Sequence, residues 1–197
     1  MLTLFHAPKS RSSRIIWLLE ELGADYRVEP TDIPRMDGTG HADAGNPHPD
    51  KKVPALVDDG VLVTESSAIV LYLTDKLPAA GLAPPIGDPK RGPYLSWLAY
   101  YAGVMEPIVV MTTAGLADHP AVQRTFRDRG AMDRRILGAL EAGPWVLGEK
   151  FSGADVLLAS LGQFARAMMP AGPVVDSYLE RCSSRPALAR AVAKHGE

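Results

Sequence analysis

The chain has 197 residues, of which 46% are hydrophobic and 22% are charged, so it is long enough for one large domain or two small ones with a sizeable core. A formal net charge of −2, without a basic run interleaved with aromatic residues, gives no electrostatic reason to expect a nucleic-acid partner. The single Cys182, interpreted as a small buried hydrophobic residue, excludes an internal disulfide framework and a four-cysteine zinc site.

Other classes of partner are also disfavoured. No apolar run approaches the roughly 20 residues that span a membrane, and the first six residues lack the charged start of a targeting signal. We therefore expect no membrane partner and, by default, a cytoplasmic location. Histidines and aspartates share the loop at 41–50 without regular ligand spacing, so no metal site is predicted.

The N-terminal part of the chain begins with a predicted strand at residues 2–5. A helical stripe runs from 12 to 22 and ends at Gly23, and a second strand follows at 26–29. Two strands joined by one helix are expected to pair in parallel. Residues 30–50 are rich in Pro, Gly, Asp and His and are predicted to form a loop.

A hairpin and a helix follow this loop. Asp58-Asp59-Gly60 separates two β-type runs, which is a strong hairpin signal. An apolar-periodic helical segment begins directly after Glu65-Ser66-Ser67 and extends to Leu77, and Thr64 and Ser66 carry the side-chain oxygens that helix starts favour. The order β-α-β, loop, β-β-α is that of a thioredoxin-like α/β domain.

Two features of this region suit a small zwitterionic peptide. The backbone N–H groups of Ser66 and Ser67 at a helix N-terminus favour a carboxylate, and Glu65 beside them suits an ammonium group. Val53-Pro54 interrupts a strand, because proline cannot donate to a ladder. Either this is an edge strand with a trans bond, or the bond is cis and leaves the Val53 backbone free to pair with an extended peptide.

The sequence Lys-Val-Pro-Ala-Leu, followed by Glu-Ser-Ser-Ala-Ile-Val-Leu-Tyr-Leu, resembles the glutathione-binding half of the cytosolic glutathione S-transferases, bacterial members in particular. The resemblance covers most of residues 1–77. It implies a thioredoxin-like N-terminal domain followed by an all-α domain, glutathione as co-substrate, and a homodimer. It also assigns the glutathione-binding residues: Lys52 or Lys51 for the glycyl carboxylate, Val53 and Pro54 for the cysteinyl unit, and Glu65 and Ser66 for the γ-glutamyl end.

In this family the segment after the first strand carries the Ser, Tyr or Cys that acts on the sulfur. The candidates here are Ser12 and Ser10, with Arg11, Ser13 or a backbone N–H as alternatives. Ser12 or Ser13 is equally explained as the N-cap of the first helix. No Cys lies in this segment, which argues against the thiol-disulfide branch of the family, because mixed-disulfide chemistry needs a protein thiol. No Tyr occurs at 6–25, so the tyrosine-using classes do not fit.

The rest of the chain is predicted to be helical. Residues 78–89 hold four prolines and two glycines and are predicted to link a domain at 1–77 to one at 90–197. Ser152 and Asp155 form a capping box at the start of an apolar, central helix. The predicted helices are 94–116 with a kink at Pro107, 120–140, 155–168, 176–183 and 186–194.

An aromatic stripe in the first of these helices suggests where a second substrate binds. Trp97, Tyr101 and Met105 fall at about one-turn spacing and are predicted to line the acceptor pocket, although such a stripe is more often core. The resemblance implies conjugation of glutathione to small hydrophobic electrophiles. Alternatives are a glutathione-dependent isomerase or dehalogenase, and a non-catalytic protein of this fold that binds a partner protein as a stress regulator.

Overall fold

The computed structural model describes residues 1–195 and divides into two compact units. The first, which we call the sheet unit, contains Met1–Ala80 and the C-terminal segment from Ser184; the second, the helical unit, is Gly81–Ser183. The sequence predicts a division at 78–89 with everything beyond it in one domain. The structure differs in that the C-terminal segment joins the sheet unit, because its helix packs against the first helix of the chain.

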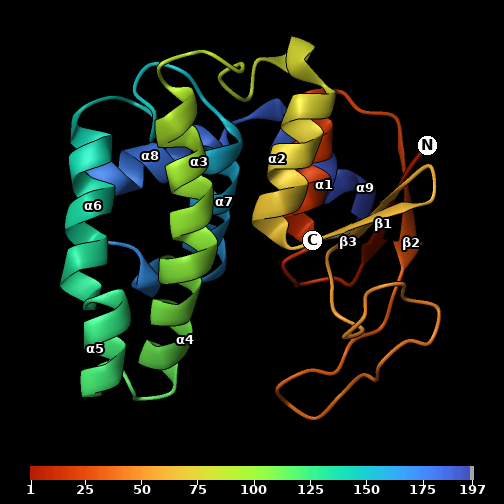
Figure 1. The fold of residues 1–197 in the computed structure, drawn as a ribbon, viewed down its shortest axis with the longest axis horizontal. Coiled ribbons are helices and arrows are strands. Elements are labelled where there is room, and N and C mark those ends of the chain that lie inside the picture. The colour runs from red at the N-terminus through yellow and green to blue at the C-terminus, as the bar shows by residue number, and fades with distance from the viewer. Residues whose placement is uncertain (196–197) are drawn as a thin grey trace. The chain divides into compact units, whose positions relative to one another are not determined.

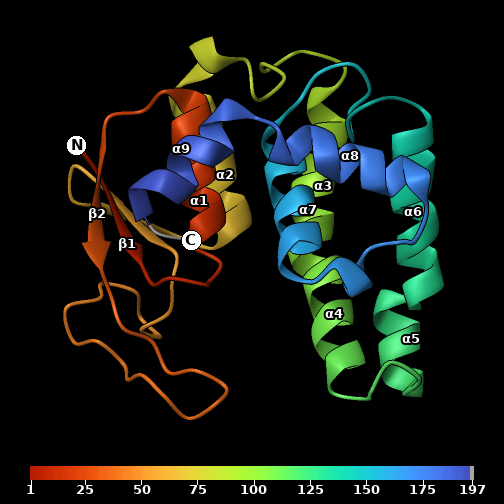
Figure 2. The same cartoon turned by 180° about the vertical axis from the view of Figure 1, so that it is seen from behind.

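The sheet unit is built on a four-stranded mixed sheet in the order β2-β1-β3-β4. Strand β1 is parallel to β2 and antiparallel to β3, and β3 is antiparallel to β4. Helices α1 and α2 lie along the sheet (Figure 1), and α9 lies against α1 (Figure 2). The elements are β1 (Leu2–His6), α1 (Ser13–Leu22), β2 (Tyr26–Pro30), β3 (Ala55–Asp58), β4 (Val61–Thr64), α2 (Ser66–Lys76), the short 3-10 turn η1 (Pro78–Ala80) and α9 (Pro186–His195). The predicted thioredoxin-like order is confirmed.

Local sequence accounts for these elements. Helix α1 ends at Gly23, which takes the left-handed conformation (φ 61°) that glycine adopts without steric cost. The turn between β3 and β4 is made by Asp59 and Gly60, both with positive φ, as the hairpin signal predicts. Apolar side chains from the sheet and from α1 and α2 fill the core: Leu4, Ile15, Leu18, Leu56, Ile69 and Leu73 are all buried.

The helical unit contains α3 to α8. Helices α7 and α8 pack together, α6 packs on α8, and α3 packs on α7. The elements are α3 (Arg91–Tyr100), the π-helical η2 (Tyr101–Met105), α4 (Glu106–Thr113), α5 (Pro120–Phe126), α6 (Arg129–Glu141), α7 (Gly153–Phe164), the 3-10 turn η3 (Arg166–Met168) and α8 (Pro173–Ser183). The prediction of an all-α second part is confirmed.

Two irregularities divide the predicted helices, and the first lies next to the kink predicted at Pro107. Before Pro107 the helix widens into a π-turn, in which the N–H of Glu106 donates to the carbonyl of Tyr101. Proline offers no N–H to the preceding turn, so the distortion falls there. The predicted helix at 120–140 breaks at Arg127, which has φ 66°, and Asp128 starts α6 by accepting a hydrogen bond from the Ala131 N–H at 2.7 Å.

The predicted capping box of α7 is confirmed. The Asp155 carboxylate accepts hydrogen bonds from the Ser152 N–H (2.9 Å) and hydroxyl (2.8 Å), and also from the Val146 N–H at 2.9 Å. Burial raises the pKa of Asp155 to about 6, and these hydrogen bonds oppose that rise. Cys182 is buried in α8, as expected of a small hydrophobic residue.

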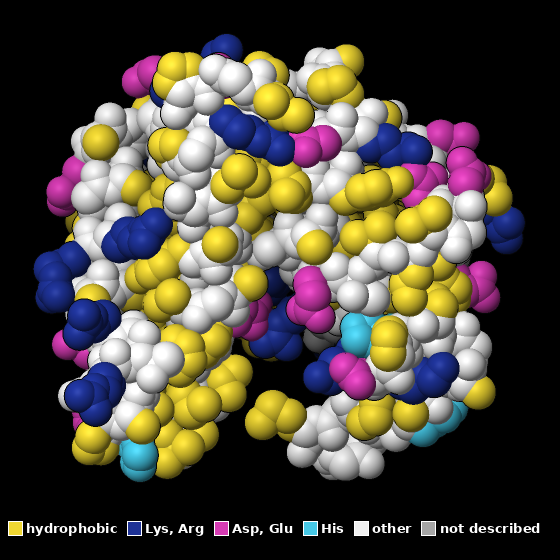
Figure 3. All heavy atoms as spheres, in the orientation of Figure 1, with side chains coloured by type: hydrophobic (Ala, Val, Ile, Leu, Met, Phe, Trp, Pro, Cys, Tyr) yellow, Lys and Arg dark blue, Asp and Glu magenta, His cyan; other side chains and the backbone are white. Residues whose placement is uncertain are grey.

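One stretch departs from the expectation about apolar runs. Arg91–Thr113 forms 23 residues of near-continuous helix, long and apolar enough by length and composition to cross a membrane. Core helices of soluble proteins pass the same test, but they are mostly buried, whereas 28% of the apolar window of this helix is buried. Apolar side chains gather on the surface over α4 (Figure 3), where Val110 is exposed.

Candidate functional site

Sheet register brings three predicted site segments to one edge of the sheet. Phe5 near the end of β1 pairs with Ala55, the first residue of β3, and Ala55 pairs with Thr64, the last residue of β4. The β1–α1 loop, the Val53-Pro54 segment and the start of α2 therefore emerge side by side. Residues separated by more than 50 positions in sequence meet there, within a single compact unit.

The β1–α1 loop holds a chain of hydroxyl groups. The Ser10 Oγ lies 2.6 Å from the Ser12 Oγ and donates to the Ala7 carbonyl at 2.7 Å. The Ser12 Oγ lies 2.8 Å from the Nδ1 of His6 and accepts from the Ala7 N–H at 3.2 Å. Ser12 is completely buried, whereas Ser10 is half-buried. Of the two predicted serines, Ser10 thus has the hydroxyl nearer to solvent.

The remaining candidates in this loop take different positions. Ser12 occupies the N-cap position of α1, but its side chain makes no capping hydrogen bond because it faces His6. Ser13 is the first helical residue, and its N–H donates to the Ser10 carbonyl at 3.2 Å. Arg11 is exposed. The N-cap interpretation of Ser12 is therefore right in position, although its hydroxyl is used elsewhere.

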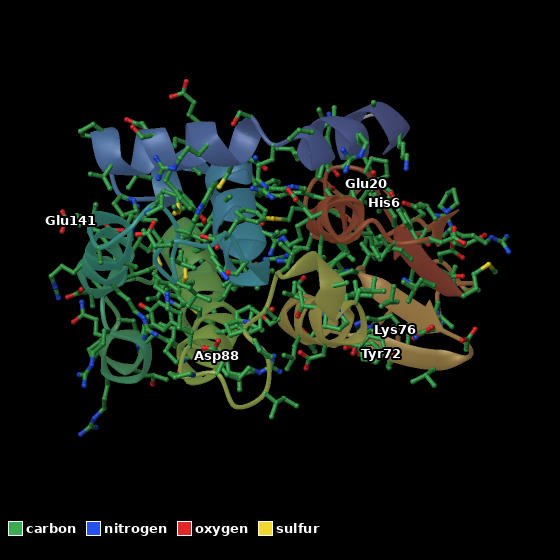
Figure 4. The ribbon with its side chains drawn as sticks, turned by 90° about the horizontal axis from the view of Figure 1, so that it is seen from above. His6, Glu20, Tyr72, Lys76, Asp88 and Glu141 are labelled. Carbon is green, nitrogen blue, oxygen red and sulfur yellow. The ribbon has the colours of Figure 1, made fainter. Side chains whose placement is uncertain are left out.

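His6 is a member of this cluster that the sequence analysis missed. It is the last residue of β1 and is buried, like Leu2 and Leu4 at alternate positions of the same strand. Figure 4 labels its place in the sheet unit. The available signal was strand alternation, because positions 2, 4 and 6 share a face and two of them are leucines. A histidine on the core face of a strand needs a polar partner, and Ser12 supplies one.

The Val53-Pro54 bond is cis, which resolves the two alternatives left open by the sequence. Val53 is partly exposed and precedes β3. Among the described residues, neither its N–H nor its carbonyl has a backbone hydrogen-bond partner. This backbone is therefore available to an extended peptide at the edge where the three segments meet.

The two lysines before Val53 differ in their contacts. The Lys51 ammonium group donates to the carbonyls of Asn46 (2.7 Å) and Ala44 (3.4 Å), so it closes its own loop. Asn46 is buried, and its Nδ2 donates to the Lys52 carbonyl at 2.9 Å. The Lys52 side chain is exposed and has no hydrogen-bond or ion-pair partner among residues 1–195. Of the pair, Lys52 is the cation free to meet an anion.

Glu65 and Ser66 lie at the beginning of α2. Glu65 is the N-cap, with φ 66° and ψ 122°, and its side chain is exposed and makes no capping hydrogen bond. Ile69 donates the first helical hydrogen bond back to the Glu65 carbonyl, so the Ser66 N–H precedes the helical ladder. The predicted capping by Thr64 or Ser66 side chains does not occur, because Glu65 holds the N-cap position.

Backbone conformation singles out the same segments. Five non-glycine residues in the described part of the chain have positive φ, and three of them are Lys9, Lys51 and Glu65. These three belong to the β1–α1 loop, the segment before Pro54 and the start of α2. Such conformations cost of order 1–3 kcal/mol each and concentrate at functional sites, so their distribution favours a site at this edge.

The predicted acceptor residues belong to the helical unit. Trp97 lies in α3, whereas Tyr101 and Met105 begin and end the π-turn, and all three are buried. The Tyr101 hydroxyl donates to Glu106 at 2.8 Å, and the guanidinium of Arg135 stacks 5.1 Å from the Trp97 ring centre. The stripe thus takes part in the packing of this unit.

The loop at 31–52 shows no clustered metal ligands. His41 pairs with Asp32 through its Nδ1 at 2.6 Å, and His48 accepts a hydrogen bond from the Asp50 N–H at 3.0 Å. Within residues 1–195, no group of three or more His, Cys, Asp or Glu side chains is arranged to hold a metal ion. Arg35 from this loop donates to the Pro8 carbonyl at 3.1 Å, which ties the loop to the β1–α1 loop.

Comparison with known proteins agrees with this geometry. Residues 1–75 match the model of the glutathione S-transferase N-terminal domain. The disulfide-bond oxidoreductase YfcG of Escherichia coli K12 is 29% identical over 209 residues, which cover 98% of this chain and 95% of that protein. The family resemblance drawn from the motifs is thus supported for the N-terminal domain.

Solved structures extend the similarity to the whole fold. A glutathione S-transferase from Actinobacillus pleuropneumoniae superposes with a TM-score of 0.82 at 29% identity, covering 100% of this chain and 93% of that one. A sphingomonad glutathione S-transferase, solved with glutathione, has a TM-score of 0.77 at 28% identity and 98% coverage of both chains. The thioredoxin-like plus all-α fold is therefore that of glutathione S-transferases.

Proposed function

We propose that this chain, whose first 75 residues match a glutathione S-transferase N-terminal domain, binds glutathione and conjugates it to small hydrophobic electrophiles. The observation that carries the proposal is the convergence of the β1–α1 loop, Val53-Pro54 and Glu65-Ser66 at one sheet edge. The glutathione-bound sphingomonad structure, with the same fold at 28% identity, supports glutathione as the co-substrate.

Each part of the tripeptide has a chemical counterpart at this edge. The exposed Glu65 carboxylate suits the γ-glutamyl ammonium group, and the Ser66 N–H at the start of α2 suits the adjoining carboxylate. The unpaired backbone of Val53, followed by Pro54, suits the cysteinyl unit. Lys52 suits the glycyl carboxylate, whereas the Lys51 side chain is already occupied. Charge and hydrogen-bonding character thus match along the ligand.

Thiol activation is assigned to the β1–α1 loop. A thiolate is the nucleophile, and a hydroxyl donor or nearby cation lowers the pKa of a thiol. Ser10 is half-buried, and its hydroxyl is the one best placed to contact a sulfur atom. The buried Ser12 hydroxyl forms a hydrogen bond with the Ser10 hydroxyl, and Arg11 contributes an exposed cation. Ser13 or a backbone N–H remains the alternative donor.

The electrophile pocket is assigned to Trp97, Tyr101 and Met105. A π-turn of the kind that contains Tyr101 and Met105 often marks a functional site. Aromatic and thioether groups suit a small apolar electrophile. The same bound thiolate would serve glutathione-dependent isomerisation or dehalogenation, which therefore remain alternatives. Binding a protein partner without catalysis is the further alternative.

A homodimer in the cytoplasm is the proposed form of the protein. Val61 on β4 is exposed and shares a sheet face with Val63, which lines a shallow groove of about 580 Å³. The groove is lined by Val63, Ala68, Leu71, Tyr72, Asp75 and Lys76. Exposed apolar surface rimmed by charged groups is typical of a protein contact, and a second copy of the chain is the occupant we propose.

A second candidate function is favoured by similarity to YfcG, which is named a disulfide-bond oxidoreductase. The chain's single cysteine, Cys182, is buried in α8, so a protein thiol is not offered for exchange. A bound glutathione thiolate attacking a disulfide needs no such thiol. Turnover of a small disulfide, compared with turnover of an aryl halide such as 1-chloro-2,4-dinitrobenzene, separates this activity from conjugation.

The binding proposal is tested by calorimetric titration of glutathione into the wild-type protein and two variants. Glu65→Ala is expected to weaken binding at least several-fold, because the ammonium group loses its partner. Glu141→Ala, which removes an exposed carboxylate from α6 in the helical unit, is the matched control and should leave the affinity unchanged. Absence of binding by the wild type would reject glutathione transfer, and equal affinities of all three proteins would reject the Glu65 assignment.

A further inference from the structure

The chain of hydroxyls in the β1–α1 loop ends at a buried histidine that substrate binding alone does not require. We propose that His6 is a positioning residue that takes up, through Ser12 and Ser10, the proton that a thiol gives up when it becomes a thiolate. The inference rests on the proposed function, because the thiol in question is that of bound glutathione. It adds a proton acceptor to a loop that otherwise offers the sulfur only hydrogen-bond donors and a cation.

The oxygen and nitrogen atoms of this chain are within proton-transfer distance of each other. The Ser10 Oγ is 2.6 Å from the Ser12 Oγ, which is 2.8 Å from the His6 Nδ1. Both separations are those of good hydrogen bonds. This hydrogen-bond chain runs from the half-buried Ser10 hydroxyl to the buried His6 ring. Its outer end can therefore contact a ligand, whereas its inner end is shielded from water.

Backbone groups fix the two oxygens without fixing their protons. The Ser12 Oγ accepts from the Ala7 N–H, and the Ser10 Oγ accepts from the Ser12 N–H, both at 3.2 Å. Each hydroxyl hydrogen has a choice of acceptors: that of Ser10 reaches the Ser12 Oγ or the Ala7 carbonyl, and that of Ser12 reaches His6 Nδ1 or the same carbonyl at 3.3 Å. Rotation of the two hydroxyl groups therefore reverses the donor–acceptor direction of this hydrogen-bond chain, while the oxygen and nitrogen atoms stay in place.

The proton step balances in this arrangement. The Nδ1 lone pair of neutral His6 accepts from the Ser12 hydroxyl, Ser12 accepts from Ser10, and Ser10 accepts from the thiol. As the S–H bond breaks, its electron pair stays on sulfur, and each hydroxyl passes one proton inward. An N–H bond forms at His6 Nδ1. The products are a thiolate that accepts a hydrogen bond from Ser10 and an imidazolium on β1, with no change in total charge.

Several cationic side chains belong to this loop or to segments next to it. Arg14 is buried in the first turn of α1, and Arg35 donates to the Pro8 carbonyl. Lys9 and Arg11 belong to the loop itself. These groups favour the thiolate at the outer end of the chain.

The variant that tests the relay is His6→Asn, since an asparagine side chain can occupy the Nδ1 hydrogen-bonding position but cannot take up a proton. The readout is thiolate absorbance of bound glutathione in the ultraviolet as a function of pH, with glutathione affinity measured alongside by calorimetry. We expect affinity within about twofold of wild type and roughly tenfold less thiolate at pH 7. Ser10→Ala should produce a similar loss, because it cuts the chain at its outer end.

A measurement on the wild-type protein covers the case in which His6→Asn does not fold. In protein labelled with ¹⁵N at its five histidines, glutathione should convert the Nδ1 signal of His6 from unprotonated to protonated, whereas S-methylglutathione, which has no thiol proton, should not. An unchanged signal with glutathione overturns the relay, as does a normal thiolate titration in His6→Asn. If the wild type binds no glutathione, the proposed function fails together with the relay; binding without these changes rejects the relay alone.

Discussion

Arg185 and Glu21, 164 positions apart, form a two-point ion pair that joins the C-terminal segment to α1. The Nε of Arg185 lies 2.5 Å from Oε1 of Glu21, and its Nη2 lies 2.7 Å from Oε2. The indole N–H of Trp17 donates to the same Oε1 at 2.9 Å. The Glu21 side chain is only 7% exposed, so this carboxylate depends on its partners for the hydrogen bonds that water would provide.

The ion pair predicts a stability loss in Arg185→Ala. Among residues 1–195, removing Arg185 leaves the buried carboxylate with only the Trp17 hydrogen bond. We expect a cost of about 2 kcal/mol, less than for a fully buried pair, because Arg185 is partly exposed. The measurement is the urea midpoint followed by tryptophan fluorescence. Arg124→Ala, an exposed arginine of α5, is the control. Equal midpoints for the two variants would mean that the pair does not hold α9 in place.

Glu20, beside Glu21, predicts the response of the sheet unit to acid. Burial raises the pKa of its carboxyl, but hydrogen bonds from Lys194, Tyr26 and Arg190 outweigh that effect and lower the pKa from 4.5 to about 2. Because the folded pKa is the lower one, the stabilisation is complete at neutral pH. It is lost as the pH falls from about 4.5 through about 2.

This stabilisation is measurable as a pH-dependent difference between wild type and Glu20→Gln. The gap in pKa corresponds to roughly 3 kcal/mol at most, and the solvent exposure of Lys194 and Arg190 reduces it to about 1–2 kcal/mol. Urea titrations should show this difference at pH 7 and little of it near pH 2.5. A difference that stays constant over that interval would contradict the assignment.

Most of the sheet unit follows from local sequence. Strand alternation, Gly23, the Asp59-Gly60 turn and Pro54 are signals that act within a few residues, and each appears in the structure at its predicted position. The all-α second part follows for the same reason. Local sequence patterns do not predict that α9 packs against α1. The charges that join these helices, such as Arg185 and Glu21, lie far apart in the sequence and come together only when the chain folds.

The candidate site divides in the same way. Glu65 and Val53 are recognisable from motif, and the structure adds that register brings them to one edge. His6 and Asn46 were missed because the loop conformation brings their hydrogen-bond partners, Ser12 and the Lys52 carbonyl, next to them. Sequence periodicity does not encode that conformation. The break at Arg127 was missed for a related reason, since a positive φ on an arginine has no signal of its own.

The two lysines before Val53 provide a test of how the glycyl carboxylate is held. Lys52→Ala is expected to weaken glutathione binding several-fold, with a smaller difference from wild type at high salt, because an exposed cation acts through screened charge. Lys51→Ala removes hydrogen bonds to the Asn46 and Ala44 carbonyls. It should lower thermal stability and leave the salt dependence of glutathione binding close to that of the wild type. Calorimetry at 50 mM and 500 mM salt, with melting curves, measures both effects. The opposite pattern would assign the carboxylate to Lys51.

The exposed apolar edge of β4 makes the proposed homodimer testable. Val61→Glu introduces a charge on the face of β4 that also carries Val63, one of the residues lining the groove over α2. Tyr72 and Lys76 of α2, labelled in Figure 4, line the same groove, and both bond to Asp58 at 2.5 Å. If a second copy covers this face, burying the new carboxylate should weaken the dimer by a factor of about 100 or more, while far-ultraviolet circular dichroism stays unchanged. Met36→Glu, at a fully exposed position in the loop after β2, is the control. Sedimentation equilibrium measures the dissociation constants; a wild-type monomer would reject the dimer, and an intact Val61→Glu dimer would move its interface away from this face of β4.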